Sequence, residues 1–425
     1  MTNIQEPSPA RLSAVRQTRN NMRRTLISLA FAAVAALAIS VPESCAQKSK
    51  TMSDKQIEKE ILSYMAEYKT AGMSVVLVKG DKVVYQNAFG YRDVETKEPL
   101  EINDIFRIAS ISKSFSGMSI MQLVEQGKIS LEDDVNKYLD FSLRNPKHPD
   151  IPITVKMLLS HTSSMMDYSG ASFYRDDHYV NPAKTTRDTI AMMFFDYAPG
   201  QGYKYCNRAL NLIGMIIEKV SGERFDEYVR NHILKPIGAD NAGYNLDSLD
   251  KSTFTTLYTY NKKKDTIERA KGYVPNNEFK VKDGSYRLGV DGCYWSPTGG
   301  MKISAPNLAK WMMTLRDGGL APTGKRIISE EGCRKLLTPV TPADPGKYYC
   351  LTTRTEPYFI DGVTLKGHTG SAQGLKSCMF FNPESDWGFV CLCSSTKLDA
   401  ENGVYMIYKK TINLLYQQYK DVLEK

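Results

Sequence analysis

Hydrophobic positions recur with two different periods along this chain, and each period predicts its own kind of element. Apolar residues stand at helical spacing in residues 57–68 and again in 404–422, close to the two ends. Two strand-like runs, 74–78 and 82–86, flank a turn at 79–81 and predict a β-hairpin. The fold is therefore expected to begin with a helix and a hairpin and to end with a helix.

Two helices are predicted in the middle of the chain. Apolar residues follow three-residue steps from Phe115 to Val124 before the stop signal Gly127, and a second helical run covers 210–220 before Gly222. An alternating run at 375–381 predicts a later strand. Strands near both ends and helices between them predict an α+β fold, with an antiparallel sheet flanked by helices and a mostly helical second lobe.

The first 46 residues are expected to be a signal peptide, with Met22 as a possible true start. Arg23 and Arg24 precede an apolar run at 26–41, and Ser44-Cys45-Ala46 offers small residues for cleavage. The run has 16 residues, whereas a membrane-spanning helix needs about 20, so an uncleaved anchor is the weaker interpretation. A lipid on Cys45 is the alternative.

The mature protein is thus expected to be exported to the periplasm or cell envelope as one domain, residues 47–425. Contact with a membrane is expected only through the signal segment or a lipid anchor. Residues 241–292, rich in Tyr, Lys, Asn and Gly, show no readable period and are expected to decorate the entrance of a site.

Composition narrows the classes of function. Removing residues 1–46 deletes five arginines and two glutamates and lowers the net charge from +8 to +5, which is too mild to predict nucleic-acid binding. Seven cysteines remain without the spacing of a disulfide framework or a zinc site, so we expect neither metal nor cofactor. Three of them, at 378, 391 and 393, are expected to be small buried hydrophobes. Only Cys206 is expected to matter chemically.

The string Ser110-Ile111-Ser112-Lys113 carries the first candidate chemistry. If a helix begins at Ser110, side chains three residues apart share one face, so a neutral Lys113 amine can take the Ser110 proton. The unpaired N–H groups of a first helical turn can hold an oxyanion. Alone, such a string is more often an N-cap serine followed by a surface lysine.

A second candidate cluster is Tyr205-Cys206-Asn207, which follows a turn-rich segment and precedes a predicted helix. In an extended loop, residues i and i+2 point the same way. The Tyr205 phenol is a candidate proton shuttle, and the Asn207 amide a candidate donor to a substrate carbonyl. Taken by themselves, a core tyrosine and an N-cap asparagine explain these residues as well.

The third cluster is His368-Thr369-Gly370-Ser371. A glycine at 370 would let a ligand lie close along a strand edge, and the Ser371 N–H is a candidate second oxyanion donor beside that of Ser110. An ordinary hairpin rim would also explain these residues.

Together, the three strings resemble the class C branch of the serine β-lactamase and penicillin-binding-protein superfamily, which includes D-alanyl-D-alanine carboxypeptidases and esterases. That branch carries Ser-x-x-Lys, Tyr-x-Asn and Lys/His-Thr-Gly in this order. The resemblance runs from about residue 57 to 419 and departs where Ser164 and Met165 replace the branch's usual glycine and leucine. It implies the same α/β-plus-α architecture.

These residues predict a serine hydrolase that works through an acyl-enzyme. Ser110, Lys113 and Tyr205 are the expected catalytic residues, and the N–H groups of Ser110 and Ser371 the expected oxyanion hole. The substrate is expected to contact Asn207, His368, Thr369 and Gly370. The family's β-lactamases usually have lysine where this chain has His368. The histidine therefore favours a peptidase or esterase, and a class C-type β-lactamase is the alternative. A slow or non-catalytic penicillin-binding protein is the alternative from another class.

Overall fold

A nine-stranded antiparallel sheet organises the computed structural model, which describes residues 52–167, 193–270, 279–282 and 284–425. The strand order is β3-β2-β1-β13-β12-β11-β10-β9-β8, so the two ends of the sequence meet in the middle of the sheet. The sheet strands are β1 (Gly72–Lys79), β2 (Lys82–Asp93), β3 (Glu98–Pro99), β8 (Thr341–Asp344), β9 (Lys347–Tyr349), β10 (Arg354–Ile360), β11 (Val363–Ala372), β12 (Leu375–Phe381) and β13 (Trp387–Ser394).

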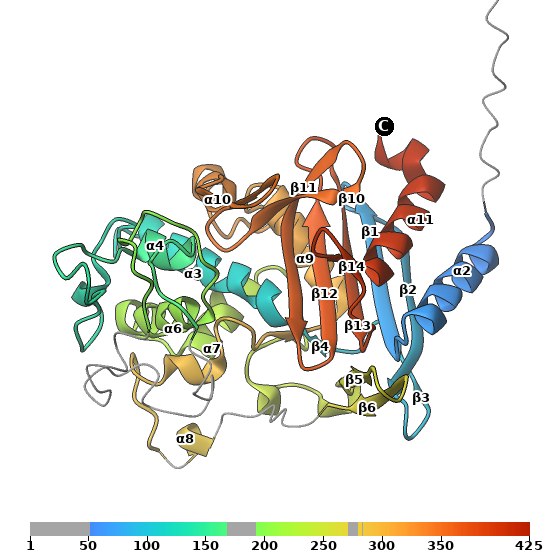
Figure 1. The fold of residues 1–425 in the computed structure, drawn as a ribbon, viewed down its shortest axis with the longest axis horizontal. Helices are drawn as coiled ribbons and strands as arrows, with labels where there is room; N and C mark the ends of the chain where they lie inside the picture. Colours follow the sequence, from blue (N-terminus) through green and yellow to red (C-terminus); the bar gives the residue numbers. More distant parts are fainter. Residues whose placement is uncertain (1–51, 168–192, 271–278, 283) are drawn as a thin grey trace, which may run out of the picture. The chain divides into compact units, whose positions relative to one another are not determined.

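The helices cover both faces of this sheet (Figure 1). On one face lie α2 (Asp54–Glu67) and α11 (Met406–Leu423), and on the other α9 (Ala305–Arg316) crosses β1, β12 and β13. Alternate residues of β1 consequently enter two separate hydrophobic clusters, with Val75 on the α11 side and Val76 on the α9 side. The predicted hairpin and both terminal helices are confirmed. The strand predicted at 375–381 is also confirmed, as β12. An alternating pattern would leave one face of the strand exposed, but every residue of β12 is buried because helices cover both faces of the sheet.

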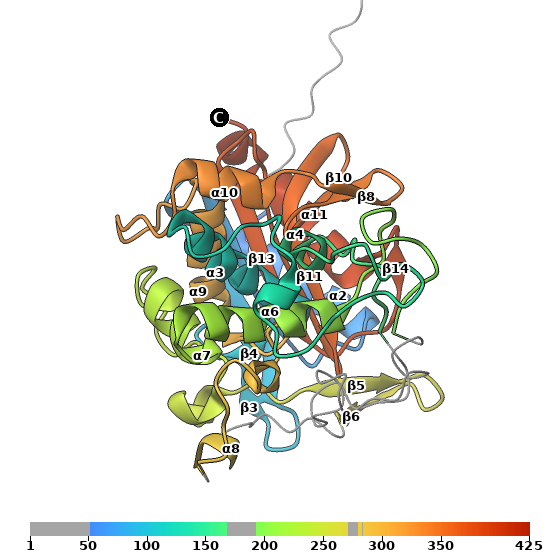
Figure 2. The ribbon, with the colours of Figure 1, turned by 90° about the vertical axis from the view of Figure 1, so that its left-hand side faces the viewer.

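A mostly helical region stands beside the sheet, as predicted (Figure 2). It packs α3 (Lys113–Glu125) and α4 (Val155–Leu159) against α6 (Asn207–Ser221), and α7 (Phe225–Val229) follows. Both predicted stop signals are confirmed, because Gly127 and Gly222 have φ angles of 68° and 74°, which only glycine adopts without strain. A short helix, α10 (Glu330–Leu337), contacts α3.

Short elements complete the fold. Three two-stranded ribbons pair β4 (Phe106–Arg107) with β7 (Lys302–Ile303), β5 (Tyr258–Asn261) with β6 (Thr266–Arg269), and β14 (Ala400–Glu401) with β15 (Val404–Tyr405). The remaining helical turns are η1 (Ala109–Ser112), η2 (Val135–Lys137), η5 (Arg230–Leu234), η6 (Leu246–Ser248), η7 (Lys251–Thr253), α8 (Phe279–Lys282) and η8 (Gly292–Trp295).

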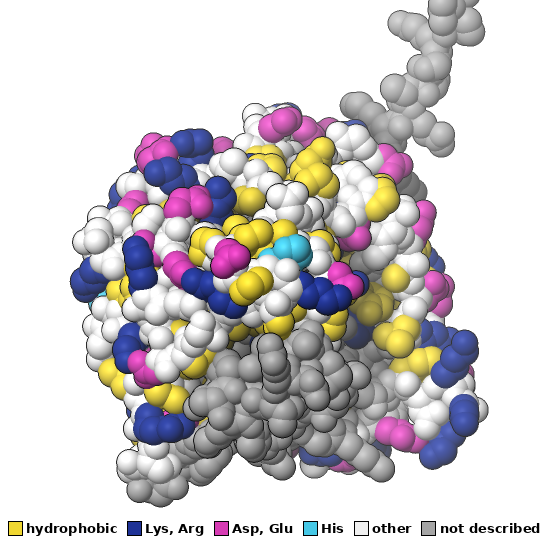
Figure 3. Space-filling model, turned by 60° about the vertical axis from the view of Figure 1, so that its left-hand side comes forward, with side chains coloured by type: hydrophobic (Ala, Val, Ile, Leu, Met, Phe, Trp, Pro, Cys, Tyr) yellow, Lys and Arg dark blue, Asp and Glu magenta, His cyan; other side chains and the backbone are white. Residues whose placement is uncertain are grey.

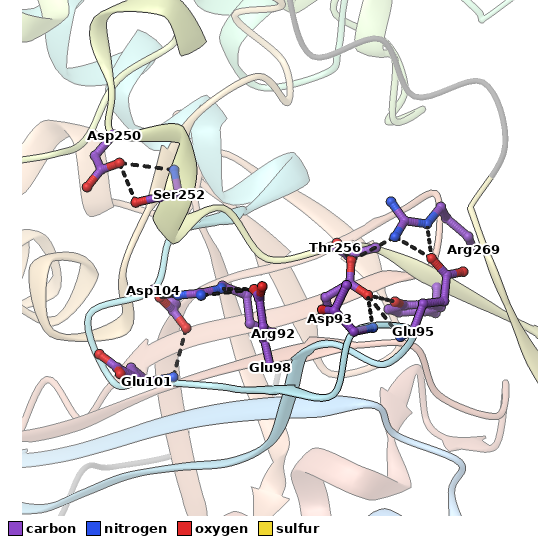
Figure 4. Close-up of polar contacts among 12 residues, drawn as sticks. Arg92, Asp93, Glu95, Glu98, Glu101, Asp104, Asp250, Ser252, Thr256 and Arg269 are labelled. Atoms are coloured by element: carbon purple, nitrogen blue, oxygen red, sulfur yellow. Dashed lines mark hydrogen bonds and ion pairs between the residues drawn. The ribbon is translucent and has the colours of Figure 1, made fainter.

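Ion pairs fasten part of the predicted entrance segment to the end of β2 (Figure 4). Arg269 pairs with Asp93 and Glu95, and Thr256 donates to Asp93. Burial by itself would raise the pKa of Asp93, but the hydrogen bonds from Thr256 and neighbouring N–H groups lower it to about 2. The β5–β6 ribbon is thereby tied to the sheet.

Two observations concern the surface. On the face seen in Figure 3, basic and acidic side chains are interspersed with each other and with hydrophobic ones. Within the described ranges, the helices fall short of the length and apolarity that crossing a membrane requires. The predicted signal peptide lies outside the described residues.

Candidate active site

Ser110 and Lys113 are brought together by a single helical turn. The expectation that an α-helix begins at Ser110 is wrong in detail, because η1 is a 3-10 turn and α3 begins at Lys113. With three residues per turn, a 3-10 helix places residues i and i+3 in line. Lys113 Nζ accordingly lies 3.1 Å from Ser110 Oγ. Ala109, just before the serine, has a φ of 48°, a left-handed conformation that costs a non-glycine residue free energy and marks a constrained turn.

The partners of Lys113 prepare its amine to accept a proton. Its Nζ, with the side chain fully buried, lies 2.8 Å from Asn207 Oδ1 and 2.9 Å from the Thr298 carbonyl oxygen. Both oxygens can only accept, so a neutral amine gives them its two N–H groups and turns its lone pair toward Ser110. Burial lowers the pKa of Lys113 to about 7, against the opposing negative charge of Asp167. The neutral amine is therefore well populated near neutral pH.

Asp167 lies in the candidate site, although no sequence pattern indicated it. Its carboxylate accepts from the backbone N–H groups of Asn207 and Arg208, both at 3.0 Å, and from Asn207 Nδ2 at 2.9 Å. It thus caps the start of α6, where a negative charge is favourable, because the N-cap residue Cys206 offers no side-chain cap. The same contact fixes the Asn207 amide with its oxygen toward Lys113. No local spacing in the sequence links residue 167 to 207.

The contacts of Asn207 limit its predicted role. Its Oδ1 accepts from Lys113 and, at 2.8 Å, from Thr298 Oγ1, while one of its two Nδ2 hydrogens goes to Asp167. Only the second hydrogen remains for a substrate carbonyl. Asn207 therefore orients Lys113 first, and its contact with substrate stays a prediction.

Tyr205 contacts Lys113 through its aromatic ring and not through its hydroxyl group. Lys113 Nζ is 4.8 Å from the ring centroid. The phenol oxygen is buried and lacks a completed hydrogen bond to any described residue. Burial raises the pKa of Tyr205, and the nearby Ser110 hydroxyl opposes this effect only in part. Tyr205 is hence held as a phenol, a form that donates a proton and cannot serve as the first base.

Cys206 does not have the chemical role that its position suggested. Its thiol is fully buried, and burial raises its pKa, with Asp167 adding to the effect. A thiol kept protonated is a poor nucleophile. The expectation for Cys206 is wrong, whereas the burial expected of Cys378, Cys391 and Cys393 is confirmed.

The third cluster forms an edge of β11 beside η1. Pairing of β11 with β12 runs to Ala372, whereas its pairing with β10 ends at Gly367. A Cβ at Gly370 would stand 2.2 Å from the Ile108 carbonyl oxygen, so the close approach of the chain just before η1 requires this glycine, and its contact with a substrate stays a prediction. Thr369 and Ser371 alternate with Gly370 and direct their side chains to the opposite face, and β11 contacts η1, the turn that carries Ser110.

His368 is buried and neutral, with both ring nitrogens already engaged. Nε2 lies 3.1 Å from the Tyr349 hydroxyl oxygen and Nδ1 2.5 Å from the Thr369 carbonyl oxygen. Burial, together with the charges of Arg354 and Lys113, holds the pKa of His368 well below its usual range. The structure therefore gives His368 no spare N–H for a substrate carboxylate. Its ring lies 6.2 Å from that of Tyr205, so all three clusters converge.

Comparison with known proteins identifies the family and supports the fold. The chain is similar to Protein flp of Staphylococcus aureus, with 23% identity over 87% of this chain and 70% of that protein. An octameric penicillin-binding protein homologue from Pyrococcus abyssi superposes with a TM-score of 0.66 at 28% identity, covering 87% of this chain and 79% of the other. The D-amino acid amidase of Ochrobactrum anthropi shares the fold, with a TM-score of 0.66, 20% identity and coverage of 87% and 99%. The sequence pattern of the Beta-lactamase family matches residues 57–406, and the chain belongs to that family of serine hydrolases.

Proposed function

We propose that this chain is an exported serine hydrolase that acts through an acyl-enzyme on peptide, ester or β-lactam carbonyls, with a preference for D-alanyl peptides or esters. One observation carries the proposal. The Lys113 amine is buried, has a pKa lowered to about 7, is held by two acceptor-only oxygens, and lies 3.1 Å from Ser110 Oγ. Such a lysine is a general base with its nucleophile already in reach.

The reaction then follows from the contacts. Ser110 Oγ forms a bond to the carbonyl carbon while its proton passes to Lys113 Nζ. The carbonyl oxygen becomes an oxyanion, which the N–H groups of Ser110 and Ser371 stabilise. As the oxyanion returns to a carbonyl, the bond between the carbonyl carbon and the leaving group breaks, and the Tyr205 phenol donates its proton to the leaving group and regains one from Lys113. Water next attacks the acyl-enzyme by the reverse sequence of proton transfers and releases the acid.

The charge near the site supports a substrate with a free carboxylate. His368 is neutral, but Arg354 begins β10 beside it, and its positive charge acts on both His368 and Tyr205. Its Nη2 bonds Glu356, whereas its buried Nε lacks a hydrogen-bond partner among the described residues. A guanidinium with an unused donor is suited to a carboxylate, such as that of a D-alanyl peptide.

Acylation is tested by labelling. The protein is incubated with a fluorescent penicillin or a p-nitrophenyl ester, and the Ser110 peptide is then analysed by mass spectrometry. Ser110→Ala should lose the label and several orders of magnitude of turnover. The matched control is Ser119→Ala, because this buried hydroxyl only bonds back to the Phe115 carbonyl within α3. Labelling of the alanine variant at position 110 would refute the nucleophile.

Substrate preference separates the remaining alternatives. The ratio of kcat/KM for a peptide ending in D-alanyl-D-alanine to that for its C-terminal amide should fall about tenfold in Arg354→Gln, since one charge-assisted contact is lost. Glu356 keeps Lys347 at 2.8 Å, so this variant leaves no unpaired buried carboxylate. An unchanged ratio would remove Arg354 from substrate recognition. Rapid nitrocefin hydrolysis would favour the β-lactamase, and labelling without turnover the binding protein.

Export is proposed from the N-terminal sequence. The mature protein is expected to begin at Gln47, or to carry a lipid on Cys45. Mass analysis of material from the cell envelope distinguishes the two. Cytosolic protein with an intact Met1 or Met22 would contradict both.

A further inference from the structure

A buried chain of hydrogen bonds crosses the site behind the catalytic residues. It begins at the Cys206 N–H, which donates to His161 Nδ1 at 3.2 Å. His161 Nε2 lies 3.1 Å from the Tyr349 hydroxyl oxygen, and that oxygen lies 3.1 Å from His368 Nε2. The chain ends where His368 Nδ1 meets the Thr369 carbonyl oxygen. It therefore joins the loop that carries Tyr205 to the edge of β11.

The two backbone ends give this chain one direction. The Cys206 N–H can only donate, so His161 Nδ1 accepts and the His161 proton is on Nε2. Tyr349 receives that bond and has a single hydrogen, which it gives to His368 Nε2. The His368 proton is then on Nδ1, where it donates to a carbonyl oxygen that can only accept. Every donor and acceptor is satisfied with both imidazoles neutral.

Burial and strain show that these side chains are strongly constrained. The exposed fractions of His161, Tyr349 and His368 are 1%, 1% and 2%, so water cannot replace a lost partner. His161 has a φ of 60°, a left-handed conformation that costs a non-glycine residue of order 1 kcal/mol or more. Such strain persists where the surroundings fix the residue, as two hydrogen bonds do here.

We propose that Tyr349 is a positioning residue of the active site, whose hydroxyl holds His161 and His368 in opposite neutral tautomers and ties the Tyr205 loop to β11. The proposal rests on the proposed function, because the segments it joins carry Tyr205 and the predicted oxyanion donor Ser371. It assigns to His368 a role in shaping the strand, and leaves recognition of a substrate carboxylate to other residues.

The charged and titratable groups around the chain all disfavour a charged imidazole. Lys113 of α3 faces both histidines, and Arg354 of β10 faces His368. The other titratable neighbours of Tyr349 are Tyr203, Tyr205 and Cys350, which are neutral at pH 7. A second proton on His161 would stand on Nδ1 and point at the Cys206 N–H, so two donors would face each other. A second proton on His368 would stand on Nε2 and face the Tyr349 hydroxyl hydrogen in the same way.

The tautomers are tested directly by histidine ¹⁵N NMR. The chain has five histidines, which single substitutions can assign. We expect His161 to carry its proton on Nε2 and His368 on Nδ1, with both neutral from pH 5.5 to 8. A charged ring in that range, or the same tautomer at both positions, would overturn the proposal. This measurement uses the wild-type protein and does not depend on catalysis.

Function is tested with Tyr349→Phe. Loss of the hydroxyl should mix the His368 tautomers and lower kcat/KM for acylation about tenfold or more, as small misplacements of reacting groups do. The control is Tyr408→Phe, which removes an equally buried hydroxyl that has no hydrogen-bond partner among the described residues and should stay within about twofold. A Tyr349→Phe variant with unchanged tautomers or unchanged kcat/KM overturns the proposal. Failure of the wild-type protein to acylate Ser110 would instead refute the proposed function.

Discussion

Replacing Asp167 with asparagine should move the acid limb of the activity profile to lower pH. Activity in kcat/KM rises with pH as the Lys113 ammonium of the free enzyme loses its proton, so this limb reports the lysine pKa. The negative charge of Asp167 stabilises the ammonium and raises that pKa. Removing the charge therefore lowers the pKa further below its usual value, and the neutral base survives at a lower pH.

The expected size follows from two hydrogen bonds. Asp167 Oδ2 lies 2.9 Å from Asn207 Nδ2, and Asn207 Oδ1 lies 2.8 Å from Lys113 Nζ. Since the nitrogen and oxygen of one amide are about 2.3 Å apart, the carboxylate oxygen is at most about 8 Å from the amine. At that distance the Coulomb energy is about 2 kcal/mol at a dielectric constant of 20 and about 0.5 kcal/mol in water. The limb should move down by between about 0.4 and 1.5 pH units.

The assay is kcat/KM for a p-nitrophenyl ester between pH 5 and 9. Asparagine keeps one acceptor oxygen and loses the other, so the free energy of unfolding, measured in urea, should also fall by about 1 kcal/mol. Asp134→Asn is the control, because Asp134 likewise accepts from a backbone N–H at the start of a helical turn but does not act on Lys113. A limb that stays in place or moves up in Asp167→Asn would refute the electrostatic reasoning.

Three further predictions concern other groups. Gly370→Ala should lower both the melting temperature and acylation, because its Cβ would overlap the Ile108 carbonyl oxygen, and a variant that retains both would contradict this packing. Iodoacetamide at pH 8 should leave activity intact and Cys206 unmodified in mass spectra, since the thiol is buried and its pKa raised. Burial raises the pKa of Glu218 from 4.5 to about 7, so the folded state keeps a proton that the unfolded state loses above pH 4.5. Stability should therefore fall by about 3 kcal/mol as pH rises from about 4.5 through 7. In Glu218→Gln, the free energy of unfolding measured in urea should fall less over this pH range. An equal fall in the variant and the wild-type protein would contradict the raised pKa of Glu218.

Local pattern was sufficient to predict the elements and the three clusters. The spacing of Ser110 and Lys113 survives the change from an α-helical to a 3-10 turn, because either geometry places residues three apart on one side. The stop signals Gly127 and Gly222 were readable because left-handed backbone is a local requirement. Short-range rules therefore located the proposed nucleophile and its proposed base.

The residues that set the chemistry of the site could not be predicted in the same way. Asp167 meets α6 across 40 residues of sequence, and Tyr349 meets His161 across 188. An aspartate in a loop and a tyrosine in a strand are ordinary in composition, and only the tertiary fold brings them to their partners. The requirement for glycine at 370 likewise comes from Ile108, a contact that no local pattern encodes.

Burial keeps the nitrogens of this site uncharged to different degrees, and this difference predicts a simple pH profile. Burial lowers the pKa of Lys113 to about 7, within the range where enzymes work. His161 and His368 are held neutral by burial and by neighbouring positive charge, and their pKa values lie well below the usual range. Since Lys113 is the one of these three groups with a pKa near neutrality, the wild-type enzyme should show one acid limb of unit slope. A second proton in that limb would mean that a histidine takes part in the acylation step.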